Sequence, residues 1–283
     1  AVRFEDAVCM GGWPLDDHPP SGFDRSEEQP GVQIYPAHPY NIPLRSLYSR
    51  NIRNLMMAGR NFSASHVAFS STRVMSTCAV MGQAAGTAAA LCAGAGLAPR
   101  QLAQDKARLT ELQQVLLRDD QTIVGARNAD PSDVARRAAV SASGELPGAA
   151  AKHVLDGYVR DLPNQTDHVW AATMAADGAW IQLTWPQPQQ LRHVQITFDT
   201  GFQRLLRLTA QASYSTKIIR GPQPETVRDY ELLCTDATGQ THSLAKMTGN
   251  HQRLNRHEFA AVAAKSLRLC ITATNGADTA RVY

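Results

Sequence analysis

Apolar and polar residues alternate with a period of two in four segments of the second half of the chain. This alternation predicts β-strands with one buried face, and the Pro, Gly and Asn residues between the segments are typical of turns. Short strands separated in this way predict an antiparallel β-sandwich. The alternating apolar positions are Ile181, Leu183 and Trp185; Val194, Ile196 and Phe198; Tyr230, Leu232 and Cys234; and Leu267, Leu269, Ile271 and Ala273.

The first half has a different pattern, in which a short apolar run precedes a long stretch of small residues. Leu55–Ala58 form an apolar run that ends at Gly59, which predicts a strand buried on both faces. We expect a helix to begin near Ser76 and Thr77, which are both good caps, and to end by Gly96.

The predicted helix is made almost wholly of small residues. Gly82, Ala85, Gly86 and Ala89 would let a flat body or another backbone approach the helix closely. The amino end of a helix carries partial positive charge and free N–H groups, which suit an electron-rich ligand. From periodicity alone, tight packing inside an ordinary protein core explains the same residues.

The small-residue stretch also has the length of a membrane span. It contains no charged residue between Val74 and Pro99, and Gly82 and Gly86 have the spacing of a transmembrane contact motif. However, alanine and glycine contribute little transfer free energy, and Gln83 is polar. We therefore predict a buried helix and no membrane span.

The composition changes along the chain and predicts two domains. Seven prolines break residues 1–53 into short extended pieces and loops, and residues 99–122 have a helical pattern with one leucine-rich face. We expect an α/β domain over residues 1–122, a linker over 123–150, and an all-β jelly-roll sandwich over 151–283. The apolar face of the second helical pattern consists of Leu102, Leu109, Leu112, Val115 and Leu116.

Charge and composition narrow the class of protein. The chain has 283 residues, of which 43% are hydrophobic and 19% charged, as in globular proteins rather than disordered ones. The net charge of +3 comes from scattered basic residues, so we predict no nucleic-acid partner. Five cysteines and nine histidines have no metal-ligand spacing, so we predict no metal site. The cysteines leave the redox compartment undecided.

The segment Asn54–Ala90, NLMMAGRNFSASHVAFSSTRVMSTCAVMGQAAGTAAA, closely resembles the flavin-contacting carboxy-terminal segment of the FAD-dependent oxidoreductases. The likeness extends more loosely back through Tyr40–Leu47 to Gly12–His18. It implies that Ala58-Gly59-Arg60 lies near the ribityl chain of FAD and that residues 81–85 bring a helix start against the isoalloxazine. The cofactor-binding residues expected on this basis are Gly59, Arg60, Arg73, Met81, Gly82, Gln83, Ala84 and Ala85.

The same resemblance implies that the chain is a carboxy-terminal portion of a longer flavoprotein. No strand followed by GxGxxG, the turn that holds the pyrophosphate of a dinucleotide, occurs in the sequence. The first domain is then a fragment of an FAD-binding domain, and its expected partner is the amino-terminal FAD-binding half of the same protein.

The β-rich half resembles, more diffusely, a galactose-binding-like sandwich of the discoidin kind. The matching residues are Val154–Gly157, Trp170, Ala179–Leu183 and Leu191–Phe198. The resemblance implies binding of sugars or calcium, or a structural role. Asp156 followed by Gly157 fits a calcium loop, but a turn aspartate that accepts backbone N–H groups is favoured. By analogy, an extracytoplasmic location, periplasmic or secreted, is favoured.

Three histidines are candidate proton carriers, because flavin enzymes move a proton beside the hydride and imidazole titrates near neutrality. His18 follows the acidic pair Asp16-Asp17, His38 precedes Tyr40 in a proline-rich loop, and His66 lies in the loop inside the strongest motif. A surface position or a loop-orienting role is the alternative for each of them.

Arg60 and Arg73 are the candidate cations. Each can bond FAD phosphate, ribityl oxygens or a substrate carboxylate, and a structural ion pair with Asp6, Asp16 or Asp17 is the alternative.

The sequence therefore predicts the carboxy-terminal part of an FAD-dependent oxidoreductase that transfers hydride through flavin N5. The expected substrate is a small molecule or a carbohydrate-related compound. The alternative is a non-catalytic glycan-binding or structural module attached to a truncated flavoprotein remnant.

Overall fold

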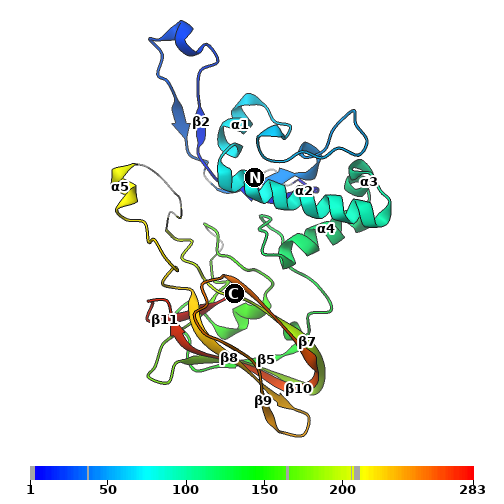
Figure 1. Ribbon diagram of the computed structural model, residues 1–283, viewed down its shortest axis with the longest axis vertical. Helices are drawn as coiled ribbons and strands as arrows, with labels where there is room; N and C mark the ends of the chain where they lie inside the picture. Colours follow the sequence, from blue (N-terminus) through cyan, green and yellow to red (C-terminus); the bar gives the residue numbers. More distant parts are fainter. Residues whose placement is uncertain (1–3, 37, 164–165, 205, 207–210) are drawn as a thin grey trace. The chain divides into compact units, whose positions relative to one another are not determined.

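A computed structural model describes residues 4–36, 38–163, 166–204, 206 and 211–283 (Figure 1). The chain divides into two compact units, residues 1–129 and 130–283, each with its own hydrophobic core. The expected fold class is confirmed, because the first unit mixes helices and strands and the second is built mainly from strands.

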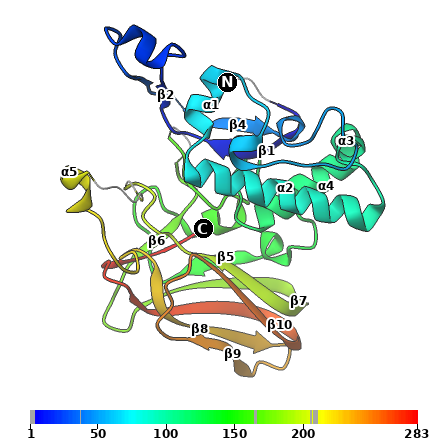
Figure 2. The same cartoon turned by 45° about the horizontal axis from the view of Figure 1, so that its top comes forward.

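The first unit consists of two small antiparallel sheets and a group of helices. Strand β1 pairs with β4, and β2 pairs with β3 in a separate hairpin. Figure 2 shows β1 and β4 side by side next to α2. The elements are β1 (Ala7–Gly11), β2 (Leu15–Asp17), β3 (Val32–Ile34), β4 (Tyr40–Pro43), α1 (His66–Thr72), α2 (Met75–Ala95), α3 (Pro99–Gln104) and α4 (Lys106–Arg118), with 3₁₀ turns at Gly22–Arg25, Leu44–Ser46 and Gly59–Asn61.

Helix α2 buries one face and exposes the other. Met81, Ala84, Ala88 and Cys92 lie in the core of the unit with the leucines of α3 and α4. The helix is long and apolar enough to cross a membrane, by length and composition only. Only 28% of this apolar window is buried, so the helix is largely exposed and the prediction of a buried helix is wrong for all but one of its faces.

The helical pattern over residues 99–122 is two helices rather than one. Asp105 has an extended backbone, and its carboxylate accepts hydrogen bonds from the N–H groups of Ala107 and Arg108 at the start of α4. The predicted leucine-rich face is buried at Leu102, Leu109, Leu112 and Leu116.

The predicted strand over Leu55–Ala58 is wrong. Only Met56 makes a single bridge, to Tyr48, and the Leu55 side chain is 38% exposed. The apolar run was read as buried because no polar residue interrupts it. Its pairing is short, because it is limited to the N–H of Ser49 donating to the carbonyl oxygen of Leu55 and the N–H of Met57 donating to that of Leu47.

The second unit is an antiparallel sandwich. A five-stranded sheet has the order β5-β7-β10-β8-β9, and a two-stranded sheet has the order β11-β6. The four alternating segments fall in β7, β8 and β10, except that Phe198 follows the end of β7 and makes a single bridge to Val282; two of the segments share the long strand β7. The elements are β5 (Ala139–Ala142), β6 (Trp170–Thr173), β7 (Ala179–Thr197), β8 (Val227–Asp236), β9 (Thr241–Met247), β10 (Leu254–Thr274), β11 (Thr279–Val282), the short helix α5 (Ala212–Ser215) and the 3₁₀ turns Val134–Arg137 and Ala151–Leu155.

The core between the two sheets contains large aromatic side chains. Trp170, Phe198 and Tyr230 are almost fully buried, and the rings of Phe198 and Tyr230 meet edge to face with centroids 5.1 Å apart. Strand β5 belongs to the five-stranded sheet, although it lies in the segment 123–150 that the sequence suggested as a linker.

Candidate functional site

Polar side chains from β2 and α1 meet in the first unit. The His66 cluster is defined here as Asp16, Asp17, His18, His66, Arg60 and Arg73. The contacts between β2 and α1 bring residues 16–18 next to both ends of α1. Two of the three predicted histidines and both predicted arginines are therefore together.

His66 is the first residue of α1 and not part of a loop as expected. Ser65 caps this helix by accepting a hydrogen bond from the N–H of Ala68. The Nε2 atom of His66 lies 2.9 Å from Oδ1 of Asp17 and 3.2 Å from the carbonyl oxygen of His18. The carbonyl oxygen of His18 is the hydrogen-bond acceptor, so Nε2 carries the proton, whereas Oδ1 of Asp17 lies at ion-pair distance but accepts no hydrogen bond from a described residue.

His18 is held by the hairpin that contains it. Its Nδ1 lies 2.6 Å from the carbonyl oxygen of Pro30, and its Nε2 lies 3.4 Å from Oδ2 of Asp16. The bond across the hairpin supports the structural alternative for this residue, although its side chain is 53% exposed.

His38 lies between β3 and β4 and is exposed. The contacts that join His18 to His66 do not include it. Its expected neighbour Tyr40 turns inward instead, where its hydroxyl bonds Ser71 Oγ, and Ser71 donates to the carbonyl oxygen of Trp13 over 2.6 Å. Burial raises the pKa of Tyr40, so this phenol stays protonated near neutrality. Nothing in the sequence pattern marked Ser71 as the partner of Tyr40.

The two arginines differ in how many of their donors are engaged. Arg73 donates from Nη2 to the carbonyl oxygen of Asp16 over 3.0 Å and lies 3.4 Å from Oδ2 of Asp16, which matches the predicted structural alternative. Arg60 donates only its Nε–H, to the carbonyl oxygen of Arg73 over 3.1 Å. Its two Nη groups have no partner among the residues that the structure describes.

The expected helix start at residues 81–85 needs correction. Helix α2 begins at Met75, where Val74 is its uncapped N-cap and the N–H of Cys78 already bonds the carbonyl of Val74. Ser76 and Thr77 are therefore inside the helix. Residues 81–85 lie in its second and third turns, away from the amino-terminal N–H groups.

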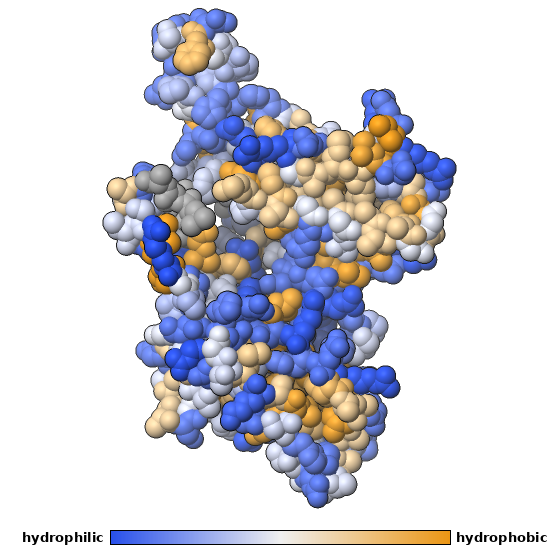
Figure 3. Space-filling model, viewed as in Figure 1, coloured by the Kyte–Doolittle hydropathy of each residue, from blue (hydrophilic) through white to orange (hydrophobic). Residues whose placement is uncertain are grey.

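Within this segment the side chains have distinct surroundings. Met81, Ala84 and Ala85 are buried, and Gln83 donates to the carbonyl oxygen of Asp119 over 3.0 Å. Gly82 is exposed, as is Gly86 one turn later, and a Cβ built on either glycine has no atom within 4 Å. Figure 3 shows a weakly hydrophobic surface over α2, where this face reaches the exterior.

Gly59 is the one predicted cofactor residue whose backbone requires glycine. Its φ is +66°, which L side chains rarely adopt, and a built Cβ would lie 3.6 Å from Cβ of Cys78. Gly59 thereby brings the turn that carries Arg60 close to the first turns of α2.

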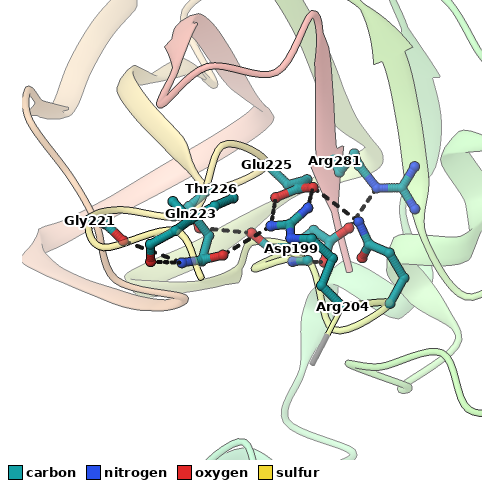
Figure 4. A network of polar contacts seen from close by, with 10 residues as sticks. Asp199, Arg204, Gly221, Gln223, Glu225, Thr226 and Arg281 are labelled. Atoms are coloured by element: carbon teal, nitrogen blue, oxygen red, sulfur yellow. Dashed lines mark hydrogen bonds and ion pairs between the residues drawn. The ribbon is translucent and has the colours of Figure 1, made fainter. Parts of the chain in front are cut away.

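The second unit contains another polar group, the Asp199 network, defined as Asp199, Arg204, Glu225 and Arg281 (Figure 4). Arg281 Nε lies 2.6 Å from Oδ2 of Asp199, whose side chain is only 3% exposed. Arg204 forms two hydrogen bonds with the Glu225 carboxylate, which hold the pKa of Glu225 below its usual value. These charges are paired with one another and close the loop between β7 and β8.

The favoured alternative for Asp156 agrees with its contacts. Its Oδ1 accepts a hydrogen bond from the N–H of Tyr158 over 2.7 Å, and its Oδ2 lies 2.7 Å from Nδ1 of His168. Within the described ranges no three His, Cys, Asp or Glu side chains form a group that could hold a metal ion. All five cysteines are free thiols.

Two family models match the chain, one in each of its two units. Residues 1–116 match the family model for FAD dependent oxidoreductases, which confirms the resemblance found in the sequence. Residues 133–201 match a model described as a domain of unknown function (DUF7402). No curated protein matches the chain.

Several solved structures are similar to part of the chain. They include chitosan-binding module 1 from a chitosanase/glucanase of Paenibacillus sp. IK-5, with 16% identity and a TM-score of 0.38 over 53% of this chain and 92% of that one. The family 32 carbohydrate-binding module of C. perfringens NanJ, in complex with galactose, has 14% identity and a TM-score of 0.38 over 52% of this chain and 90% of that one. TM-scores this low support no inference about what this chain binds.

Proposed function

We propose that the first unit contacts FAD and that the protein is an oxidoreductase. The reaction is hydride transfer between flavin N5 and a small-molecule or carbohydrate-related substrate. The match of residues 1–116 to the FAD dependent oxidoreductases carries this proposal. FAD, when bound, supplies a two-electron acceptor or donor that no side chain can provide.

The exposed face of α2 fits a planar ring. Ala79, Gly82 and Gly86 lie on this face, and space for a Cβ is open at both glycines. With no side chains larger than a methyl group along this line, a flat ligand can rest against the helix. The corrected position of the helix start means that shape, rather than the helix dipole, supports the contact at residues 82–86.

Arg60 is the side chain that we assign to an anionic or hydroxylated part of the cofactor or substrate. Its Nε–H is fixed on the carbonyl of Arg73, so its planar group is oriented while its Nη donors stay open. A guanidinium held in this way can bind phosphate, carboxylate or two hydroxyl groups with its forked geometry.

His66 is the side chain that we assign to proton transfer. Its Nε2–H faces Asp17 and the carbonyl of His18, so Nδ1 of the neutral ring is unprotonated. No described residue bonds Nδ1, so this atom is open to take a proton from a substrate. The carbonyl of His18 orients the ring, and the Asp17 carboxylate beside Nε2 stabilises the positive charge of the ring after that transfer. His18 supports His66 through its carbonyl, and a catalytic role of His38 stays a prediction.

The colour of the protein purified from its own source tests the flavin assignment. A yellow preparation with flavin absorbance supports it. Gly82→Val should then lower FAD retention about 10-fold or more, because a branched side chain against a bound ring overpacks the contact by roughly 1–3 kcal/mol.

Gly94→Val is the matched control for that substitution. It places the same side chain on the last turn of α2, where a Cβ also meets nothing within 4 Å. Both variants should leave the melting of the sandwich unchanged. Equal flavin content in the Gly82→Val variant and the unaltered protein would refute the contact with α2.

We also propose that the second unit binds carbohydrate. The supporting observation is that one face of its five-stranded sheet is open and carries polar groups beside a tryptophan. Binding of the native protein to immobilised polysaccharides tests this function. A colourless protein that binds them would favour the non-catalytic alternative. An extracytoplasmic location stays a prediction.

A further inference from the structure

The five-stranded sheet of the second unit has one buried and one open face. Ile181, Leu232 and Leu269 are opposite one another on β7, β8 and β10, and all three lie in the core. Successive residues of a strand point to opposite faces of the sheet. The neighbouring positions on these strands therefore form the outer face.

One row of this outer face runs across four strands through Trp180, Cys270, Glu231 and Lys246. Trp180 on β7 is opposite Cys270 on β10, Cys270 is opposite Glu231 on β8, and Glu231 is opposite Lys246 on β9. None of the four belongs to a core cluster, and all are at least partly exposed. The small Cys270 side chain leaves the space between the indole and the carboxylate uncrowded.

Arg268 holds the indole of Trp180 in place. Its guanidinium carbon lies 4.2 Å from the centroid of the Trp180 ring, and its Nε donates to Oε1 of Gln182 over 2.8 Å. Gln182 in turn donates from Nε2 to Oγ1 of Thr184 over 3.2 Å. The aromatic ring and the cation are therefore fixed on rigid strands before any ligand arrives.

Several polar groups of this face remain open within the part of the chain that the structure describes. The indole N–H of Trp180 and the two Nη groups of Arg268 donate to no described residue. The Glu231 carboxylate accepts no hydrogen bond, and it forms no ion pair with Lys246 although the two residues are directly opposite. Donors and an acceptor thus surround an aromatic side chain.

We propose that this outer face, centred on Trp180 and Glu231, is a binding site for a neutral saccharide. Hydroxyl groups both donate and accept, so one sugar can bond the N–H groups of Trp180 and Arg268 and also the Glu231 carboxylate. A carboxylate group of a ligand has no hydrogen to donate to Glu231, whereas a hydroxyl group can donate to it. The part of the indole that Arg268 does not cover supplies the apolar surface for the C–H groups of a sugar ring.

The loops at the strand ends offer a contrasting surface around Phe202. The Phe202 ring is 37% exposed and lies under the guanidinium groups of Arg160 and Arg253. Arg253, however, donates to the carbonyl oxygens of Phe198 and Val159. The nearby Arg204 is paired with Glu225. Arg253 and Arg204 are thus engaged in contacts within the fold. We therefore favour the outer face of the five-stranded sheet over the loops around Phe202 as the ligand surface.

This inference rests on the proposed carbohydrate binding, and binding of the full chain to galactan, mannan, xylan, β-1,3-glucan and polygalacturonate tests both. The first four probes are neutral and the last is anionic. Trp180→Ala and Glu231→Gln should each weaken binding to a neutral polysaccharide about 10-fold or more, as loss of a central contact residue does. Phe202→Ala is the matched control and should leave binding within about 2-fold.

Glu231→Gln keeps the size of the side chain, so it reports on the carboxylate even if Trp180→Ala disturbs the fold. Binding of the unaltered chain to none of the polysaccharides would refute the proposed carbohydrate function itself. Binding that survives both sheet-face variants, or that is lost in Phe202→Ala, would leave that function intact and overturn the placement on the sheet. Binding to polygalacturonate alone would overturn the neutral ligand class.

Discussion

The His66 cluster and the Asp199 network contain similar side chains but use them differently. In the Asp199 network, each carboxylate is bonded to an arginine and Asp199 is almost fully buried. In the His66 cluster, Arg60 and His66 each engage one nitrogen of the side chain and leave another open. Charges that satisfy one another hold a fold together, whereas charges with open atoms are available to a ligand. This contrast can be tested by arginine substitutions in both places.

The largest effect is expected from Arg281→Met. It leaves Asp199 buried with only the N–H of Gly201 bonded to its carboxylate, and an uncompensated buried charge costs about 3 kcal/mol of unfolding free energy. Chemical denaturation followed by circular dichroism measures the loss. Arg228→Met is the control, because Arg228 is exposed and its pair with Asp229 is screened by solvent, so the free energy of unfolding should change far less. Equal losses in the two variants would contradict the role given to the Asp199 network.

Arg60→Met should weaken FAD binding and leave the stability of the fold almost unchanged, the opposite of what is expected for Arg281→Met. Its one bond within the fold is weak and exposed, so the melting temperature should barely change. Loss of a charged donor to a cofactor oxygen should lower FAD affinity about 10-fold. The ratio of flavin to protein after dialysis measures this effect, and the Arg281→Met variant should retain its flavin. A fully loaded Arg60→Met protein would exclude Arg60 from the cofactor site.

The smallest effect is the pH dependence of the Arg204–Glu225 pair. Since Arg204 lowers the pKa of Glu225 in the folded state, the pair stabilises the fold above the ordinary value of 4.5. This stabilisation is lost as the pH falls through the lower folded-state pKa. The unaltered protein should therefore lose about 1 kcal/mol more than Glu225→Gln between neutral and strongly acidic pH. If the free energy of unfolding falls with pH in the same way in the two proteins, the Arg204–Glu225 pair does not contribute to stability.

The sequence predicted best those features that depend on local repetition. The alternation in β7, β8 and β10 and the leucine face of α4 were found because each repeats within one element. The strand expected at Leu55–Ala58 failed because its pairing with residues 47–49 stops after a single bridge, and apolarity alone does not show where pairing stops. The start of α2 was misplaced because Ser76 and Thr77 are good caps in isolation, while α1 and its cap Ser65 already fill the preceding segment.

The same limit applies to the site. His18, His66, Arg60 and Arg73 were identified from residue type and motif, but their meeting depends on the contact between β2 and α1. No sequence pattern indicated that the hydroxyl of Tyr40 would bond Ser71. The open outer face of the sheet was equally hidden, because it depends on which residues of four strands become neighbours.

The length of β7 and β10 has a consequence for how the second unit forms. Each strand contributes to two separate hydrophobic clusters of the sandwich: Ile181 and Leu269 to one, Trp185 and Leu267 to the other. Neither cluster can assemble without aligning two segments about 80 residues apart in the chain. We therefore expect the sandwich to fold slowly and in a single cooperative step, with amide protons of both clusters exchanging together.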